Sequence, residues 1–161
     1  MGGSTFLLTG GSGFFARHFT RYLLDHTNPH SIRLFARSES KLAECEALFH
    51  DHRVRILVGD IRDGDRLKTA LRGVDFVVNA AALKRVDTCE SQPQECVATN
   101  VLGTQNVAVA CLGAGVQRAV FLSTDKACDP QTFYGASKLL AERLWNASNV
   151  YSAGLPTRFA S

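Results

Sequence analysis

The chain has 161 residues, of which 45% are hydrophobic, and this size and composition are typical of one globular domain with a buried core. The net charge of +3 is small and evenly spread, and no basic block is interleaved with aromatic residues, so the sequence excludes a nucleic-acid-binding protein. The five cysteines form no C-x-x-C pair and the histidines are scattered, so we expect reduced thiols and no metal site.

The N-terminus enters a short strand directly and lacks the apolar stretch of a signal peptide. No segment approaches the roughly 20 consecutive apolar residues that span a bilayer. We therefore expect a cytoplasmic protein that does not interact with a membrane.

A glycine-rich turn follows the first predicted strand, residues 5–8, and opens a helix over residues 14–27. Gly10 and Gly13 permit a tight turn and a close approach to a pyrophosphate, and the small Ala16 lets the helix pack near the strand. The N–H groups at the start of such a helix attract phosphate. The spacing therefore predicts a dinucleotide site at Gly10, Ser12, Gly13, Phe14 and Phe15.

The second predicted strand, residues 32–36, ends in Arg37 and Ser38. An acidic residue usually holds the ribose 2′-hydroxyl of NAD at this position, whereas an arginine can pair with the 2′-phosphate of NADP. The sequence therefore favours NADP as the cofactor. NAD stays open as the alternative, because Glu39 is near enough in the chain to reach a ribose.

The rest of the chain alternates predicted helices and strands. In chain order we expect a helix over 41–49, a strand over 54–58, a helix over 63–71 with Asp63 as its N-cap, a strand over 74–78, a helix over about 94–112, a strand over 118–122, a helix over 132–146 and the start of a sixth strand at about 157–161. This alternation is typical of βαβ units with parallel strands. It predicts an α/β fold with a doubly wound parallel sheet, and one NAD(P)-binding Rossmann domain over residues 1–161.

Further cofactor contacts are expected where the third and fourth strands end. Asp60, followed by Ile61, can accept a hydrogen bond from the adenine amino group. The small side chains of Ala80, Ala81 and Ala82 let the backbone pass close to a cofactor. Lys84 is a candidate for a substrate phosphate, with a solvated loop lysine as the alternative. Asn100 is expected to anchor a water or backbone group behind the site, or to be a buried structural amide.

A chemically rich cluster follows the fifth strand. Thr124, Asp125 and Lys126 come directly after it, and Tyr134 and Lys138 lie four residues apart on one face of the next helix. In open α/β sheets, the carboxyl ends of the strands are where ligands bind. We therefore expect these five residues to form the catalytic centre.

These motifs resemble a known family. Residues 9–16, 59–63, 79–82 and 123–124, together with Tyr134-x-x-x-Lys138, are similar to the extended short-chain dehydrogenase/reductases. A narrower resemblance, to inverting UDP-N-acetylglucosamine 4,6-dehydratases and their polysaccharide-biosynthesis relatives, is carried by three segments: residues 80–86, 95–104 and 123–127. Because that family is roughly twice as long, the resemblance implies the cofactor-binding N-terminal part, truncated before the substrate part.

The resemblance also implies an activity on a nucleotide-sugar, UDP-N-acetylglucosamine. NADP would oxidise C4 of the sugar, water would be eliminated across C5–C6, and hydride would return to C6. Tyr134 would be the base on the 4-hydroxyl, with its pKa lowered by the positive charges of Lys138 and the oxidised nicotinamide and its oxygen hydrogen-bonded by Thr124. Lys126 would remove the C5 proton, for which it must be neutral, a state that burial and a nearby cation favour. Asp125 would protonate the leaving 6-hydroxyl. Tyr134 and Lys138 would also bind the cofactor, and Thr124 the substrate.

Two other functions remain open. A sugar-nucleotide 4-epimerase or reductase of the same family would use Tyr134 and Lys138 without the Asp125–Lys126 elimination pair. A non-catalytic NADP-binding module would use the glycine turn alone. The resemblance implies a homo-oligomer for the longer protein, and the exposed sheet edge of a truncated domain predicts that this chain associates.

Overall fold

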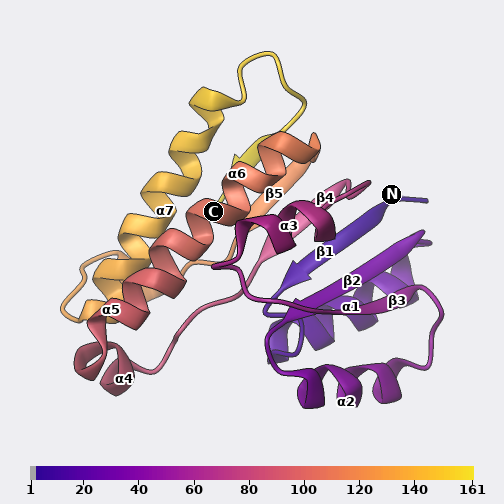
Figure 1. The fold of residues 1–161 in the computed structure, drawn as a ribbon, viewed down its shortest axis with the longest axis horizontal. Coiled ribbons are helices and arrows are strands. Elements are labelled where there is room, and N and C mark those ends of the chain that lie inside the picture. Colours follow the sequence, from indigo (N-terminus) through magenta and orange to yellow (C-terminus); the bar gives the residue numbers. More distant parts are fainter. Residues whose placement is uncertain (1–2) are drawn as a thin grey trace.

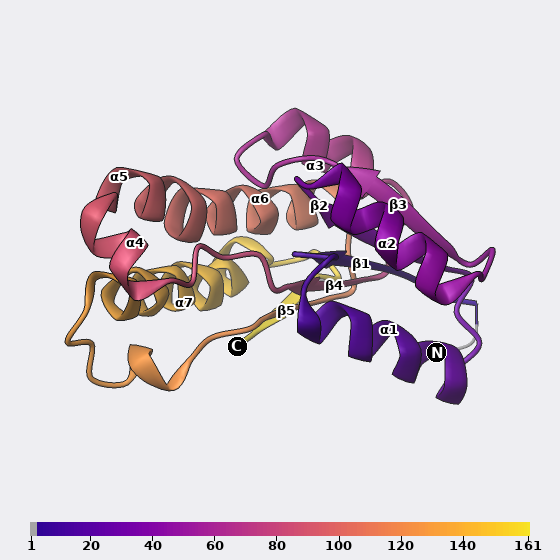
Figure 2. The ribbon, with the colours of Figure 1, turned by 90° about the horizontal axis from the view of Figure 1, so that it is seen from below.

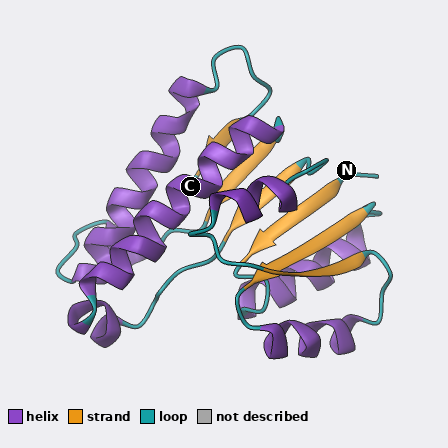
Figure 3. Cartoon of the chain, viewed as in Figure 1, coloured by secondary structure: helices purple, strands orange, loops and turns teal. Residues whose placement is uncertain are grey.

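A computed structural model describes residues 3–161 and contains one sheet of six parallel strands in the order β3-β2-β1-β4-β5-β6 (Figures 1 and 3). The strands are β1 (Thr5–Thr9), β2 (Ser31–Ala36), β3 (Val54–Val58), β4 (Phe76–Asn79), β5 (Arg118–Phe121) and β6 (Arg158–Ala160). This order confirms the predicted doubly wound parallel sheet. From β1 the chain adds strands first on one side of the sheet and then, from β4 onwards, on the other side. Such sheets bind ligands at this switch point between β1 and β4.

Helices cover both faces of the sheet. They are α1 (Phe14–His26), α2 (Glu39–Phe49), α3 (Gly64–Ala70), α4 (Val86–Ser91), α5 (Pro93–Cys96), α6 (Thr104–Ala114) and α7 (Phe133–Tyr151). One core lies between the sheet and α1 with α2, and the other lies between the sheet and α3, α6 and α7. Figure 2 shows α6 and α7 running side by side along the second face.

The two cores follow from the alternation of side chains along each strand. Leu7 and Leu8 are neighbours in β1, and both are fully buried, but they point to opposite faces. Leu7 joins the core under α3, α6 and α7, whereas Leu8 joins the core under α1 and α2. A strand buried on both faces is therefore apolar at consecutive positions, which is the pattern that the sequence shows.

The predicted helix over 94–112 differs from the observed structure in two ways. The chain forms α5, then a π-helical segment over Val97–Gly103, then α6, and the separate helix α4 precedes them. Pro93 occupies the first turn of α5, where its missing N–H is tolerated, so α4 and α5 are distinct helices. Apolar periodicity alone did not distinguish a π-helical segment from the α-helix around it.

The expectation that no segment is long and apolar enough to span a bilayer was wrong for one stretch of residues 3–161. Pro93–Ala114 has 22 helical residues, and both its length and its apolar composition would allow it to cross a membrane. More than half of the most apolar 18 residues of this stretch is buried inside the protein, and α6 packs against α3 and α7. This packing in the core accounts for its composition.

Several predicted helix starts agree with the structure. The Asp63 carboxylate caps α3 by accepting a hydrogen bond from the Arg66 backbone N–H at 2.9 Å. The Thr132 hydroxyl caps α7 in the same way, accepting from the Gly135 N–H at 3.1 Å. Helix α7 continues to Tyr151, five residues past the predicted end at 146.

Candidate active site

A cleft of about 530 Å³ opens at the carboxyl ends of the central strands. Thirteen residues singled out from the sequence line it, namely Gly10, Ser12, Gly13, Phe14, Phe15, Arg37, Ser38, Asp60, Ile61, Ala80, Ala81, Ala82 and Lys84. The sequence analysis missed Lys41, Thr99 and Leu122, which also line the cleft. Of these three, only Lys41 could have been expected from the sequence, because it is a cation four residues after Arg37, near the start of α2.

The glycine turn leaves room that a side chain would fill. Gly10 has a φ of 65°, and a Cβ atom on it would lie 2.9 Å from the carbonyl group of Ala80. The Gly13 N–H donates to the Gly10 carbonyl oxygen at 2.7 Å, which closes the turn. Helix α1 then begins with no side-chain cap and no acidic residue in its first turn. Such a helix start suits the pyrophosphate of a dinucleotide.

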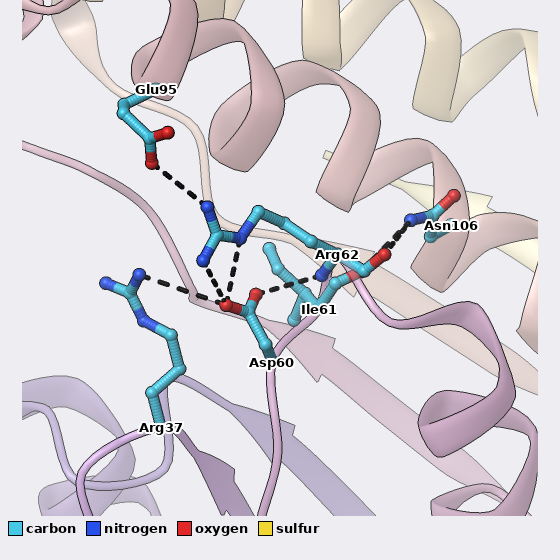
Figure 4. A network of polar contacts seen from close by, with 6 residues as sticks. All are labelled: Arg37, Asp60, Ile61, Arg62, Glu95 and Asn106. Atoms are coloured by element: carbon cyan, nitrogen blue, oxygen red, sulfur yellow. Dashed lines mark hydrogen bonds and ion pairs between the residues drawn. The ribbon is translucent and has the colours of Figure 1, made fainter.

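Asp60 is held in place by arginines (Figure 4). Its carboxylate accepts hydrogen bonds from the Arg62 backbone N–H at 2.9 Å and from the Arg62 guanidinium at 2.7 and 2.9 Å, and Arg37 lies 4.0 Å away. Burial raises the pKa of Asp60, but the hydrogen bonds and charge of Arg62 and the charge of Arg37 outweigh this effect and hold the pKa below its ordinary value. Asp60 is therefore a carboxylate at neutral pH and a hydrogen-bond acceptor.

The same loop is tied to the helices on the second face. Arg62 also pairs with Glu95 on α5 at 3.0 Å, and Asn106 on α6 donates to the carbonyl oxygens of Ile61 and Arg62 at 3.3 and 3.1 Å (Figure 4). These contacts join residues 33 to 45 positions apart in the chain. They fix the loop after β3 against helices that also pack on α7.

The predicted acid/base pair lies on the surface. The Thr124 hydroxyl donates to the Asp125 carboxylate at 2.9 Å, and the Lys126 ammonium lies 3.5 Å from the same carboxylate. The Thr124 hydrogen bond and the Lys126 charge lower the pKa of Asp125. The side chain of Lys126 is 53% exposed, so the expectation that it is buried is wrong.

Tyr134 differs from its expected electrostatics. Burial raises the pKa of this half-buried phenol, and the nearby Thr124 hydroxyl and Lys126 charge only partly offset that effect. Within residues 3–161 no hydrogen bond joins Lys138 to Tyr134, since the Lys138 ammonium instead donates to the Leu122 carbonyl oxygen at 2.6 Å. The part of the predicted lowering that would come from Lys138 is therefore not found in residues 3–161.

Lys138 is nearly inaccessible, with 3% of its surface exposed. Burial lowers the pKa of its ammonium to about 8, against the opposing charge of Glu142 one turn further along α7. Lys138, Tyr134 and Thr124 stand beside the cleft and do not line it, but Leu122, the partner of Lys138, does. The cluster that the sequence predicts to be catalytic and the cleft therefore meet at Leu122.

Asn100, in the π-helical segment, is a buried anchor behind this site. Its amide oxygen accepts from the Leu83 N–H at 2.7 Å, and its amide nitrogen donates to the Leu83 carbonyl at 3.0 Å and to the Ser137 hydroxyl at 3.0 Å. The amide thus joins the loop after β4 to α7, next to Lys138. The thiols of Cys89 and Cys96, 2.8 Å apart, are buried beside it.

Comparison with known proteins places this arrangement in a family. The sequence profile described as "Polysaccharide biosynthesis protein" matches residues 6–161. The inverting UDP-N-acetylglucosamine 4,6-dehydratase of Campylobacter jejuni subsp. jejuni strain 81-176 is 43% identical over 158 residues, which cover 98% of this chain and 47% of the relative. The chain thus spans about half the length of that curated relative.

Two solved structures share the fold. The X-ray structure of Pen from Bacillus thuringiensis superimposes with a TM-score of 0.94 at 37% identity, over 98% of this chain and 48% of Pen. DesIV, a dTDP-glucose 4,6-dehydratase from Streptomyces venezuelae with NAD and TYD bound, gives a TM-score of 0.84 at 31% identity, over 96% of this chain and 54% of DesIV. Together with the glycine turn, the doubly wound sheet and the Tyr134-x-x-x-Lys138 helix, these matches show that the chain belongs to the polysaccharide biosynthesis protein family of the short-chain dehydrogenase/reductases.

Proposed function

We propose that this chain carries the dinucleotide site and the acid/base residues of a nucleotide-sugar 4,6-dehydratase that acts on UDP-N-acetylglucosamine. The observation that carries the proposal is the Thr124-Asp125-Lys126 segment, which places a hydroxyl, a carboxylate and an ammonium within 3.5 Å contacts beside Tyr134. A dehydrogenase needs only Tyr134 and Lys138, whereas an elimination needs a further acid and base. The inverting dehydratase relative supports the same reaction.

The cleft suits a nicotinamide dinucleotide, which supplies hydride acceptance and return when bound. The Gly10–Gly13 turn and the start of α1 would hold the pyrophosphate, and the Asp60 carboxylate would accept a hydrogen bond from the adenine amino group. Tyr134 would take the proton of the sugar 4-hydroxyl. Lys126, in its neutral amine form, would then remove the C5 proton, and Asp125, in its protonated form, would give its proton to the 6-hydroxyl, which leaves as water as the C5–C6 double bond forms.

We further propose that the cofactor is NADP. Arg37 and Lys41 both line the cleft. The side chain of Arg37 is 56% exposed, and its guanidinium lies 4.0 Å from the Asp60 carboxylate. Ser38 stands between them at the start of α2. Two cations beside a helix N-terminus suit the 2′-phosphate that distinguishes NADP from NAD. NAD, which DesIV binds, is the alternative.

A sugar-nucleotide 4-epimerase is the second candidate function. The exposure of the Asp125–Lys126 pair is typical of an ordinary surface ion pair, and such a pair takes no part in a 4-epimerase reaction. An epimerase would rely on Tyr134 and Lys138 alone. The two reactions give different products from the same substrate.

One experiment separates these functions. The chain is titrated with NADP⁺ and NAD⁺ by calorimetry, and the products formed from UDP-N-acetylglucosamine are identified by NMR. We expect tighter binding of NADP⁺ by this chain, and a 4-keto-6-deoxy sugar from a protein that also includes the substrate part; the 161-residue chain alone is allowed to be inactive. A C4 epimer would favour the epimerase. Dinucleotide binding without any product would favour a binding module or a cofactor part that lacks its substrate part. Binding of neither dinucleotide would contradict the cofactor site itself.

A further inference from the structure

The ammonium of Lys138 is confined between α7 and β5 by two contacts. It donates to the Leu122 carbonyl oxygen at 2.6 Å, and it lies 3.8 Å from the centre of the Phe121 ring. A lysine ammonium has three N–H donors. Within residues 3–161 the Leu122 carbonyl oxygen is the one hydrogen-bond acceptor of this ammonium, and the Phe121 ring lies against it.

The Phe121 ring is itself fixed by aromatic packing. It is 1% exposed and lies 5.8 Å from the Trp145 ring, which in turn meets Phe159 edge-on at 5.2 Å. The Trp145 indole N–H donates to the Ala160 carbonyl oxygen at 3.0 Å, which sets the orientation of the indole. Phe121 therefore presents a rigid ring face to Lys138.

Such a ring face acts directly on a buried ammonium. Burial disfavours the charged form of lysine, and the negative face of an aromatic ring within about 6 Å attracts a cation. Among the titratable groups on α7 and on the elements that pack against it within residues 3–161, Glu142 on α7 is the one whose charge acts on Lys138, and it also favours the charged form. The Phe121 ring face and the charge of Glu142 thus act on the ammonium in the same direction.

We propose that Phe121 is a positioning residue for Lys138: the face of its ring, together with the Leu122 carbonyl oxygen, holds the charged ammonium at the end of β5, where it is available to a dinucleotide in the cleft. This inference rests on the proposed function for the contact between Lys138 and the dinucleotide. The hold of Phe121 on the ammonium does not depend on that function. The two parts can therefore be tested separately.

The test compares Phe121→Met with Phe159→Met in the 161-residue chain. Both variants replace a phenylalanine that packs against Trp145, but only Phe121 contacts the Lys138 ammonium. Three quantities are measured: the affinity for NADP⁺, the pKa of Lys138 from the pH titration of its ¹³Cε NMR signal, and the stability to urea. Lys138→Met assigns the signal.

We expect Phe121→Met to weaken NADP⁺ binding about tenfold and to lower the pKa of Lys138, because burial persists while the ring face is lost. Phe159→Met should lose comparable stability but leave both quantities unchanged. Equal affinities and equal Lys138 pKa values in the two variants would overturn the proposal. If Phe121→Met does not fold, pentafluorophenylalanine at position 121 keeps the ring shape and reverses its quadrupole, and it should lower the pKa of Lys138. An unchanged pKa there would equally overturn the proposal.

The outcome also separates this inference from the proposed function. If the unaltered chain binds neither NADP⁺ nor NAD⁺, the dinucleotide site is contradicted. The titration of Lys138 in the two variants would still decide whether Phe121 holds the ammonium.

Discussion

The Lys138 ammonium and the Leu122 carbonyl oxygen form a 2.6 Å hydrogen bond that joins α7 to the end of β5. The two residues are 16 positions apart, and Leu122 lines the cleft. The bond holds α7 at the mouth of the proposed cofactor site and directs Lys138 towards the strand. In this arrangement the phenol of Tyr134 has a raised pKa.

Burial of Lys138 predicts how stability depends on pH. The pKa of this group falls from its ordinary 10.5 to about 8 on folding, so between these values the unfolded chain binds more protons than the folded one. The free energy of unfolding should therefore rise with pH from about 8 towards 10.5, with a Lys138 contribution of roughly 3 kcal/mol at most. Urea denaturation at pH 7.5, 9 and 10 measures it.

The Lys138→Met variant should lack this rise, whatever its stability at neutral pH. Lys68→Met removes an exposed lysine that pairs with Asp65 on α3 and is the control. Parallel pH profiles for the unaltered chain and Lys138→Met would show that Lys138 is not a buried cation.

The glycine turn predicts a position-specific loss of binding. In Gly10→Ala, the alanine would have to adopt a left-handed φ of 65°, and its Cβ would lie 2.9 Å from the Ala80 carbonyl group. We expect a loss of about 2 kcal/mol in stability, and no measurable dinucleotide binding. Calorimetric titration and urea denaturation check both effects.

Gly113→Ala is the matched control, because Gly113 lies in α6 with no atom within 4 Å of its added Cβ. That variant should gain about 0.5–1 kcal/mol from higher helix propensity. Its dinucleotide affinity should not change. Undiminished binding by Gly10→Ala would mean that the turn does not hold the cofactor.

Arg37 predicts the choice between the two dinucleotides. Arg37→Ala removes a half-exposed guanidinium from the cleft and should weaken NADP⁺ binding about tenfold, because a charge-assisted contact with the 2′-phosphate is lost. NAD⁺ binding should stay the same. Arg143→Ala, an exposed arginine on α7, is the control. Equal losses for both dinucleotides would instead assign Arg37 to the positioning of Asp60.

Because Lys126 lies on the surface, replacing it should stop the proposed reaction without changing the stability of the fold. Lys126→Met removes one partner of an exposed ion pair, so the free energy of unfolding should hardly change. Under the proposed function, the 4-keto-6-deoxy product should disappear while dinucleotide affinity persists. Undiminished formation of that product would exclude Lys126 as the C5 base, and NMR analysis of the sugar decides the question.

Features that depend on neighbouring residues were predicted well. The strand over 54–58 has the predicted bounds, and Asp63 caps α3 as expected, because apolar runs and capping side chains act within a few positions. The glycine turn and the Tyr134-x-x-x-Lys138 helix were found for the same reason. The helix α4 and the π-helical segment were missed, since their boundaries depend on Pro93 and on packing around Asn100.

The sequence by itself determined the alternation of strands and helices and the place of the glycine turn between β1 and α1, because each is encoded by spacing along the chain. Only the tertiary structure decided that Lys138 bonds Leu122 over the Phe121 ring, that Arg62 joins Asp60 to Glu95, and that Lys126 is exposed. Burial lowers the pKa of Lys138 and the arginine contacts lower that of Asp60, and both effects depend on which distant segments the fold brings together.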